Sequence, residues 1–449
     1  MRNKLFLVFV LLPLWASAQD TLNLESVIRI ALEKNYAIKI AGRNKQIAAN
    51  EVTLGNAGFL PLVTAQLTRQ NSYFPRFVQT RQTVIPGDSA AGIPDRTQDV
   101  TQDFSNRTNK TFNYGATVNW TIFDGMGMFI AMDRLEELQA AGNEQAQATI
   151  EITVADVSNA YYNIIQLQER VAAFRDALDI SAQRLDLAKA QYEVGSGSKL
   201  NFLAAQVDYN TDKSALIGQE QLLSNAKTTL NQLLGRTPSA DFQVNDSIIV
   251  NDQLNLEALR GQALSQNPDL LVAQRNKNVS ALDRRLIQSQ RLPQVNLFTG
   301  YTHNNQQNRA GLFPNTNLSD VVNYGVQATL TIFDGNNLNR RIQNQRITED
   351  IRNLQLEDLK VRVEADLQRT FTDYRNALNL LQLEQENLKI AQQNVDIALE
   401  RYRLGVATPL ELREVQRNAV ATASRLIDAS YNAKLAEIEL QRLSSNIVQ

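Results

Sequence analysis

Residues 111–125 read TFNYGATVNWTIFDG, and residues 321–335 read VVNYGVQATLTIFDG. In both stretches apolar side chains alternate with small polar ones, which is the pattern of a β-strand with one apolar face. Strands of about ten residues with this pattern are typical of a transmembrane β-barrel. A half-buried antiparallel sheet in a soluble sandwich alternates in the same way, so alternation alone leaves both architectures open.

The two stretches belong to a tandem repeat, since they are offset by 210 residues (111 to 321). Near the start of each copy the letters LNLE recur at 22–25 and 254–257, and Leu-Pro pairs at 60–61 and 292–293 precede an alternating segment. The predicted organisation is a first repeat over 19–235, a linker over 236–253 and a second repeat over 254–449. The strands of the two repeats are predicted at about 62–74 and 111–123 in the first and at about 294–302 and 322–333 in the second. The polar, turn-rich segments 75–110 and 303–321 are predicted to be external loops.

After each Phe-Asp-Gly the pattern becomes helical for nearly 70 residues, up to glycines at 195 and 405. Within these helical stretches apolar residues recur at every seventh position, which predicts coiled-coil packing. The two heptad rows are Val157, Ile164, Val171, Leu178, Leu185, Tyr192 and Leu367, Tyr374, Leu381, Leu388, Val395, Tyr402. Return helices over 200–234 and 410–443 complete two long helical hairpins, so the predicted fold is mainly α with four strands per chain.

The composition disfavours an enzyme. The 449 residues contain no Cys and one His, His303, which excludes thiol nucleophiles, disulfide scaffolds, Cys-ligated zinc and His-rich metal sites. The balance of 45 basic and 47 acidic residues provides no basic field for nucleic acid. We therefore predict no catalytic residue, no cofactor, no metal and no nucleic-acid partner, and we interpret His303 as an ordinary surface residue.

Residues 1–18 have the three zones of a secretory signal peptide: a basic start, an apolar run over 5–14 and small residues before position 19. We predict cleavage after Ala18. A membrane-anchor helix is the alternative, but ten apolar residues are too few to span the hydrocarbon core. Because there is no Cys, a lipidated N-terminal Cys is excluded.

Four strands cannot close a barrel, because the smallest closed barrels have about eight. A dimer would supply eight strands and a filled interior, whereas a trimer would supply twelve and leave a lumen. Association would also cover the open edges of the sheet. The residues alone thus predict an exported oligomer with a short membrane barrel and a long helical tube.

The repeat, the Leu-Pro entries, the Phe-Asp-Gly returns, Asn267-Pro268-Asp269 and the Tyr-x-x-Gly segments at 192–195 and 402–405 together resemble the TolC family of outer-membrane efflux channels. The resemblance implies a homotrimer with a 12-stranded barrel in outer-membrane lipid of a Gram-negative-type cell and a helical tunnel in the periplasm. Such a trimer passively conducts substrates received from a periplasmic adaptor and an inner-membrane pump, in tripartite efflux or type I secretion. A periplasmic adaptor (membrane fusion) protein and an exported structural coiled-coil protein stay open as alternatives.

The resemblance also implies a periplasmic gate and tips that contact the adaptor. Glu411 and Glu414 resemble the acidic ring that lines the closed end, and Arg413 beside them is a candidate for the polar link that holds it. A plain solvated charge is the alternative for each. The candidate adaptor-contacting residues are Val194, Gly195, Ser196, Leu404, Gly405 and Val406. Glycine at these turns also has the ordinary role of ending a helix.

Overall fold

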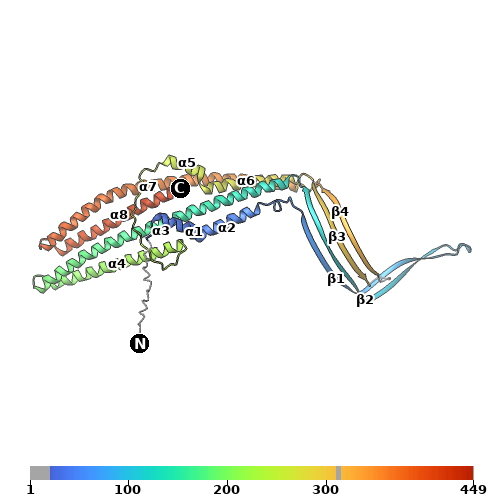
Figure 1. Cartoon of the computed structure of the whole chain (residues 1–449), viewed down its shortest axis with the longest axis horizontal. Coiled ribbons are helices and arrows are strands. Elements are labelled where there is room, and N and C mark those ends of the chain that lie inside the picture. Colours follow the sequence, from blue (N-terminus) through green and yellow to red (C-terminus); the bar gives the residue numbers. More distant parts are fainter. Residues whose placement is uncertain (1–20, 310–314, 448–449) are drawn as a thin grey trace, which may run out of the picture. The chain divides into compact units, whose positions relative to one another are not determined.

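The computed structural model describes residues 21–309 and 315–447, so the predicted signal peptide lies outside the described residues (Figure 1). The chain forms two compact units. The helical unit contains the described residues up to Ile47, the range Ala140–Arg275 and the described residues from Asn353 onward. The sheet unit contains Ala48–Gln139 and Asn276–Arg352.

Two long helical hairpins dominate the helical unit. Helix α3 (Gly127–Glu193) is followed by α4 (Lys199–Leu233), and α7 (Asn337–Arg403) is followed by α8 (Pro409–Leu443). Side chains of the predicted heptad rows are buried along much of these helices, with Ile164 and Tyr374 completely inaccessible, whereas Tyr192 near a tip is 41% exposed. In the described part of the chain, no helix combines the length and the apolar character needed to cross a membrane.

Shorter helices precede each strand pair and share one kind of joint. Helices α1 (Leu24–Lys34) and α2 (Tyr36–Glu51) meet at Asn35, and α5 (Leu256–Gln266) and α6 (Pro268–Ser289) meet at Asn267. The side-chain oxygen of each asparagine accepts hydrogen bonds from two backbone N–H groups of the following helix. The side-chain amide of Asn35 donates to the carbonyl of Leu233 at 2.7 Å, and that of Asn267 donates to the carbonyl of Leu443 at 3.1 Å. Each joint therefore caps one helix and attaches it to the end of a hairpin.

The segment between α4 and α5 is held by two buried tyrosines. The hydroxyl of Tyr161 on α3 donates to the carboxylate of Asp246, and that of Tyr374 on α7 donates to the carbonyl of Asn251. Burial is the main cause that raises the pKa of both tyrosines, so both phenols stay protonated donors. Each helical hairpin thus binds one residue of the connection between the two repeats.

Four antiparallel strands form one sheet in the order β1-β2-β3-β4. They are β1 (Leu62–Ile85), β2 (Arg96–Phe123), β3 (Gln294–Asn308) and β4 (Asn315–Thr329). Their register places the apolar residues in rows across one face, as in Ala65–Ala116–Tyr301–Val322. The opposite face has rows such as Thr64–Thr117–Gly300–Asn323. The four-strand prediction with one apolar face is confirmed.

The prediction of external loops over 75–110 and 303–321 is wrong for most of both segments. Strands β1 and β2 pair from Leu62 with Asn119 up to Ile85 with Arg96, so only 86–95 connect them (Figure 1). The pairing is interrupted only at Pro75, which has no N–H to donate, and the register is the same on both sides of it. The residue opposite Pro75, Asn106, has a positive φ of 56°. Polar residues on both faces give no alternation here, yet backbone pairing continues.

Each of the four strands extends past its predicted bounds at the end next to the connection within its strand pair. At the opposite end, β4 also differs from its prediction. β4 ends at Thr329, because its partner β3 begins opposite it at Gln294. The apolar residues that follow have no strand to pair with among the described residues of one chain, and Ile332 is 93% exposed. His303 lies within β3 rather than in a loop, where Nδ1 is 2.7 Å from Oδ1 of Asp320 and the ring stacks on Tyr114.

Candidate functional site

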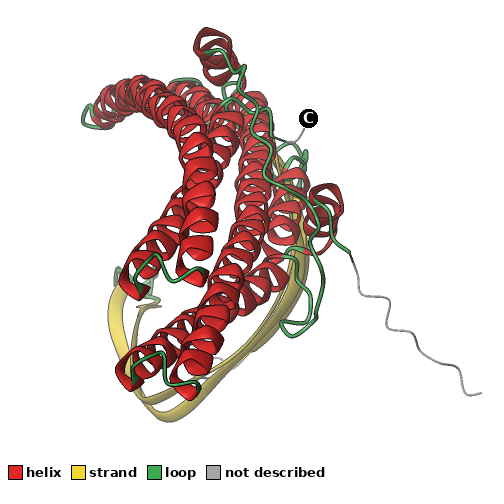
Figure 2. Ribbon diagram, turned by 90° about the vertical axis from the view of Figure 1, so that its left-hand side faces the viewer, coloured by secondary structure: helices red, strands yellow, loops and turns green. Residues whose placement is uncertain are grey.

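The two hairpin tips have the same backbone structure. In both turns a glycine adopts a positive φ, 77° at Gly195 and 72° at Gly405, which glycine adopts without strain. The N–H of Ser196 donates to the carbonyl of Gln191 at 2.9 Å, and that of Val406 donates to the carbonyl of Arg401 at 2.9 Å. These hydrogen bonds end the long helices as in a Schellman motif, and Figure 2 shows both tip loops facing the viewer.

The predicted adaptor-contacting residues are all exposed. Val194, Leu404 and Val406 are 78%, 76% and 66% exposed, and Gly195, Gly405 and Ser196 are exposed as well. Apolar side chains this accessible at a tip are uncovered in one chain. The tips therefore present two small apolar surfaces of equivalent structure.

Glu411 and Glu414 lie in the first turns of α8 and are both exposed. Glu411 belongs to a capping box: its carboxylate accepts from the N–H of Thr408 at 2.8 Å, and the Thr408 hydroxyl accepts from the N–H of Glu411 at 3.2 Å. The hydrogen bond from the Thr408 backbone N–H lowers the pKa of Glu411, so it is ionised at neutral pH. Glu414 has no hydrogen bond or ion pair with any residue that the structure describes.

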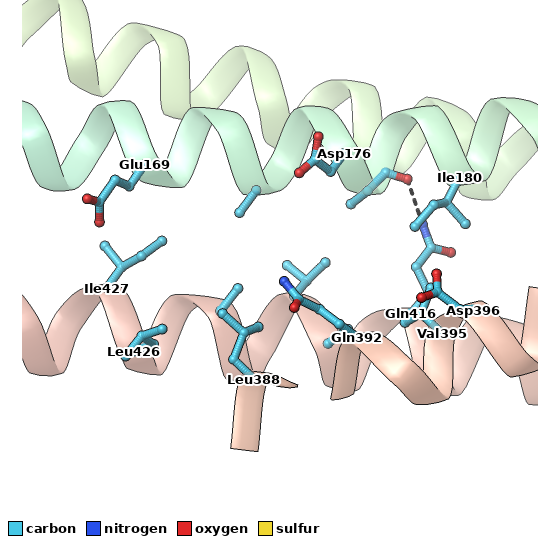
Figure 3. A pocket seen from close by; sticks show the side chains of 15 residues that line it. Glu169, Asp176, Ile180, Leu388, Gln392, Val395, Asp396, Gln416, Leu426 and Ile427 are labelled. Atoms are coloured by element: carbon cyan, nitrogen blue, oxygen red, sulfur yellow. Dashed lines mark hydrogen bonds between the residues drawn. The ribbon is translucent and has the colours of Figure 1, made fainter. Parts of the chain in front are cut away.

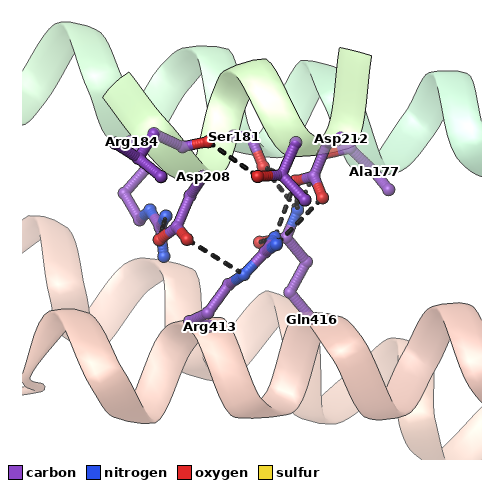
Figure 4. A network of polar contacts seen from close by, with 9 residues as sticks. Ala177, Ser181, Arg184, Asp208, Asp212, Arg413 and Gln416 are labelled. Carbon is purple, nitrogen blue, oxygen red and sulfur yellow. Dashed lines mark hydrogen bonds and ion pairs between the residues drawn. The ribbon is translucent and has the colours of Figure 1, made fainter. Parts of the chain in front are cut away.

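Arg413 is placed differently from the two acids, because its side chain is only 16% exposed. Its guanidinium donates to both carboxylate oxygens of Asp212 on α4, at 2.6 and 2.9 Å, and its Nε lies 3.7 Å from Asp208 (Figure 4). The hydrogen bond to Asp212 raises the pKa of Arg413 further above its usual range. Arg413 therefore connects α8 of the second hairpin to α4 of the first.

Further side chains extend this contact into a network that we call the junction, made of Ser181, Arg184, Asp208, Asp212, Arg413 and Gln416. Gln416 is buried and donates to the carbonyl of Ala177 at 2.7 Å and to the hydroxyl of Ser181 at 2.8 Å. Arg184, whose side chain is 2% exposed, pairs with Asp208. Two guanidinium groups thus balance two carboxylates, so α3, α4 and α8 meet through a polar contact without net charge.

Sequence reasoning identified Arg413 but missed its partners, although the repeat contains a signal for them. At the offset of 210, Asp208 aligns with Asn418, Asp212 with Thr422 and Arg184 with Asn394. Arg413 likewise aligns with Leu203. Charged residues present in one copy and uncharged in the other mark positions where the two copies contact each other rather than perform the same role twice.

The chemistry of the junction differs from that of the rest of the helical unit. Farther from the tips, apolar residues such as Ile164 and Leu230 form a core whose separation would expose apolar surface to water. At the junction, separating the helices would replace hydrogen bonds and ion pairs with contacts to water. This costs less free energy than exposing apolar surface, because the polar groups are solvated again. The tip-proximal part also buries apolar residues such as Leu412 and Tyr402, so the junction adds polar contacts to an apolar seam there.

An open four-stranded sheet with one apolar face and two long helical hairpins is the combination expected of an outer-membrane channel protein. The sequence model of the family described as outer membrane efflux protein matches residues 27–236 and 259–446. The chain belongs to the outer membrane efflux protein family.

Several relatives and solved structures extend over most of the chain. The pyoverdine export outer membrane protein OpmQ of Pseudomonas aeruginosa is 25% identical over 95% of this chain and 84% of its own length. The cation efflux system protein CusC of Escherichia coli O157:H7 is 24% identical over 93% and 84%. The structure of the outer-membrane channel OprN superposes with a TM-score of 0.72, at 16% identity, over 94% of this chain and 90% of that one. The structure of VceC from Vibrio cholerae gives 0.70, at 17% identity, over 93% and 96%.

These findings confirm the resemblance to the TolC family and the location in the outer membrane. The fold shared with OprN and VceC includes both the helical hairpins and the sheet. A periplasmic adaptor or a structural coiled coil would not account for a family match across both repeats. The chain is an efflux channel protein of the outer membrane.

Proposed function

We propose that three copies of this chain form the exit duct of a tripartite efflux or type I secretion system, with a 12-stranded barrel and a helical tunnel. The open sheet carries this proposal. Its apolar face is uncovered, with Leu67 69% and Val326 66% exposed, and β1 and β4 each have a free edge among the described strands of one chain. Lipid would cover the face, and pairing of β4 with β1 of the next copy would remove the edges.

A stripe on α7 supports the same assembly. Leu383, Ile390 and Ile397 on α7 recur every seven residues and are 51%, 57% and 59% exposed, and Leu404 continues the spacing just after the helix at 76%. The heptad rows predicted from the sequence are largely buried within one chain. The row that a neighbouring copy could contact is therefore the exposed one that begins at Leu383. A second exposed apolar row on α4 includes Leu200 and Val207, at 75% and 63%. Packing these rows together between copies would close the tunnel wall.

The tips and the acids give the duct its periplasmic end. We propose that the exposed apolar turns at 194–196 and 404–406 contact the helical tips of a periplasmic adaptor, which links the duct to an inner-membrane pump. Glu411 and Glu414 then contribute six carboxylates around the axis, which favour cations over anions in a narrow pore. The junction holds the two hairpins of each copy together while the duct is closed.

The mass of the detergent-solubilised protein tests the assembly. We expect three chains per particle by light scattering with detergent correction, and open pores when the particles are added to a planar lipid bilayer. Ile390 in the exposed stripe of α7 provides the variant: Ile390→Lys should dissociate the trimer, whereas Gln385→Lys at an exposed polar position of the same helix should not. A fully folded monomer of the unmodified chain would refute the proposed architecture.

The ion selectivity of the pore tests the acidic ring. Glu411→Gln/Glu414→Gln should lower cation selectivity in bilayers and weaken block by multivalent cations, while Gln preserves the capping-box geometry at 411. Glu386→Gln, which neutralises an exposed acid on α7, is the matched control. Equal selectivity of the double variant and the control would reject the ring without affecting the channel assignment.

A further inference from the structure

A cavity of about 520 Å³, open to solvent on one side, lies in the helical unit between α3 of the first hairpin and α7 and α8 of the second (Figure 3). Its volume lies in the range of small-molecule sites in proteins, ~300–1,000 Å³. The helices leave this space because alanines face one another, Ala173 and Ala177 on α3 against Ala419 and Ala423 on α8. Larger side chains at these positions would fill it.

Polar contacts between the hairpins bound the cavity at both ends. At one end Gln416 joins α8 to Ala177 and Ser181 of α3. At the other end Asp428 of α8 accepts from Gln166 at 2.7 Å and pairs with Arg170. These contacts fix the spacing of the two helices on either side, so the space between them is part of the fold.

The walls are mostly apolar, and the charged residues that line them are all acidic. Ile180, Leu388, Val395 and Ile427 line the cavity together with three carboxylates, Glu169, Asp176 and Asp396, and no Lys or Arg of the described chain lines it. In Figure 3 the side chain of Glu169 points from α3 toward Ile427, and Asp396 lies at the opposite end beside Gln416. The nearby cation Arg170 is already paired with Asp428.

None of the three carboxylates has a hydrogen-bonded or ionic partner among the residues that the structure describes. Burial raises the pKa of Glu169, which is the effect of removing water from a carboxylate without supplying a positive charge. Asp176 and Asp396 are exposed and lie at the open side, so Glu169 is the carboxylate that burial deprives of water. A cation beside Glu169 would supply the missing positive charge, and an apolar body attached to it would bury the facing aliphatic side chains.

We propose that this cavity is a binding site for small organic cations with an apolar body, one per chain. A metal ion is a poor occupant because most of the wall is aliphatic, and an apolar anion is excluded by the three carboxylates. Since Gln416 belongs to both the cavity wall and the junction, a bound cation lies next to the contacts that join the two hairpins. The site is complete in one chain and needs neither an adaptor nor an open pore.

Titration calorimetry of the detergent-solubilised full chain with tetraphenylphosphonium tests the proposal, with a titration into empty dodecyl maltoside micelles subtracted. Tetraphenylborate has nearly the same shape and the opposite charge and serves as the matched ligand. We expect one tetraphenylphosphonium per chain with a micromolar Kd, as ligands of this size reach in apolar sites, and no saturable binding of tetraphenylborate. Absence of tetraphenylphosphonium binding, or equal binding of both ions, would overturn the proposal.

Variants separate this site from general adsorption. Ala423→Leu should abolish binding by filling the cavity, whereas Ala421→Leu adds the same atoms at an exposed position of α8 and should leave Kd unchanged. Asp396→Asn at the rim should weaken binding roughly three- to tenfold, the effect of one partly screened charge, and Asp179→Asn outside the cavity should not. Binding that survives both Ala423→Leu and Asp396→Asn would place the cation elsewhere on the chain and reject the site.

Discussion

Replacing Arg413 tests whether the junction restrains the hairpins. Arg413→Gln removes two charge-assisted hydrogen bonds of 2.6 and 2.9 Å to Asp212, whose side chain is 15% exposed. Breaking a fully buried ion pair costs ~3–5 kcal/mol and an exposed pair at most ~1 kcal/mol. Because Asp212 keeps the hydroxyl of Ser181 as a donor, we expect an intermediate loss of about 2 kcal/mol.

A loss of this size changes the equilibrium between joined and separated hairpins by roughly 30-fold in each chain, since ~1.4 kcal/mol corresponds to a factor of ten. If the junction holds the duct closed, Arg413→Gln should increase the open fraction and the mean conductance of single channels in planar bilayers. Asp212→Asn should act in the same direction, and the double variant should cost less than the sum of the two single variants because they share one contact.

Arg417→Gln is the matched control, because Arg417 lies one turn farther along α8, is exposed and has no partner among the described residues. It should leave conductance and thermal stability unchanged. An Arg413→Gln channel that melts at a lower temperature but conducts like the unmodified protein would refute the gating role. It would leave the junction as a structural contact only.

Three further predictions concern the sheet, the helix joints and pH. Ala116→Arg should destabilise the assembled protein by ~2–4 kcal/mol per chain if it faces mid-bilayer lipid, whereas Thr117→Arg on the opposite face should be tolerated, as measured by urea unfolding in detergent. Asn35→Ala and Asn267→Ala should each cost about 1–2 kcal/mol through loss of a cap and an attached carbonyl, and the two midpoint shifts should agree because the joints are equivalent. Helix α8 should lose protection of its first turn at acid pH, measured by hydrogen exchange corrected for intrinsic rates.

The sign of the pH effect follows from Glu411. Its pKa is lower in the folded chain than in the unfolded chain, so the capping box stabilises α8 fully above the unfolded pKa and progressively less as pH falls through the lowered folded value. In Glu411→Gln the first turn should have the same protection across that range. Equal tolerance of Arg at 116 and 117, or unequal effects of the two asparagine variants, would contradict the other two predictions.

Sequence patterns predicted the elements whose signal is periodic. The heptads with Ile164 and Tyr374 predicted buried helix faces, and the alternation around Tyr114 and Tyr324 predicted strands with one apolar face. The outer parts of β1 and β2 escaped prediction because residues such as Gln79 and Thr101 are polar on either face. Their pairing depends on backbone hydrogen bonds, which side-chain patterns do not reveal.

The candidate site was predictable only in part for a related reason. Glycine turns and neighbouring acids are local features, so the tips and Glu411 were recognisable in the linear sequence. The capping role of Glu411 has a local signal too, since Thr408 and Glu411 have the spacing of a capping box. The partners of Arg413 are about 200 residues away, and only a position-by-position comparison of the two repeats identifies Asp208 and Asp212 as unlike their equivalents.

The length difference between the strand pairs has a practical consequence for whole-cell work. β1 and β2 continue over 72–85 and 96–109 beyond the last pair of β2 with β3, since Asn71 pairs with Lys110 and Lys110 with Gln307. A peptide epitope or a protease site inserted at 86–95 would interrupt none of the helices, the tips or the residues of the proposed cation site. Antibody labelling of intact cells through that insertion would report the orientation of the channel and its abundance at the surface while the transport pathway stays unmodified.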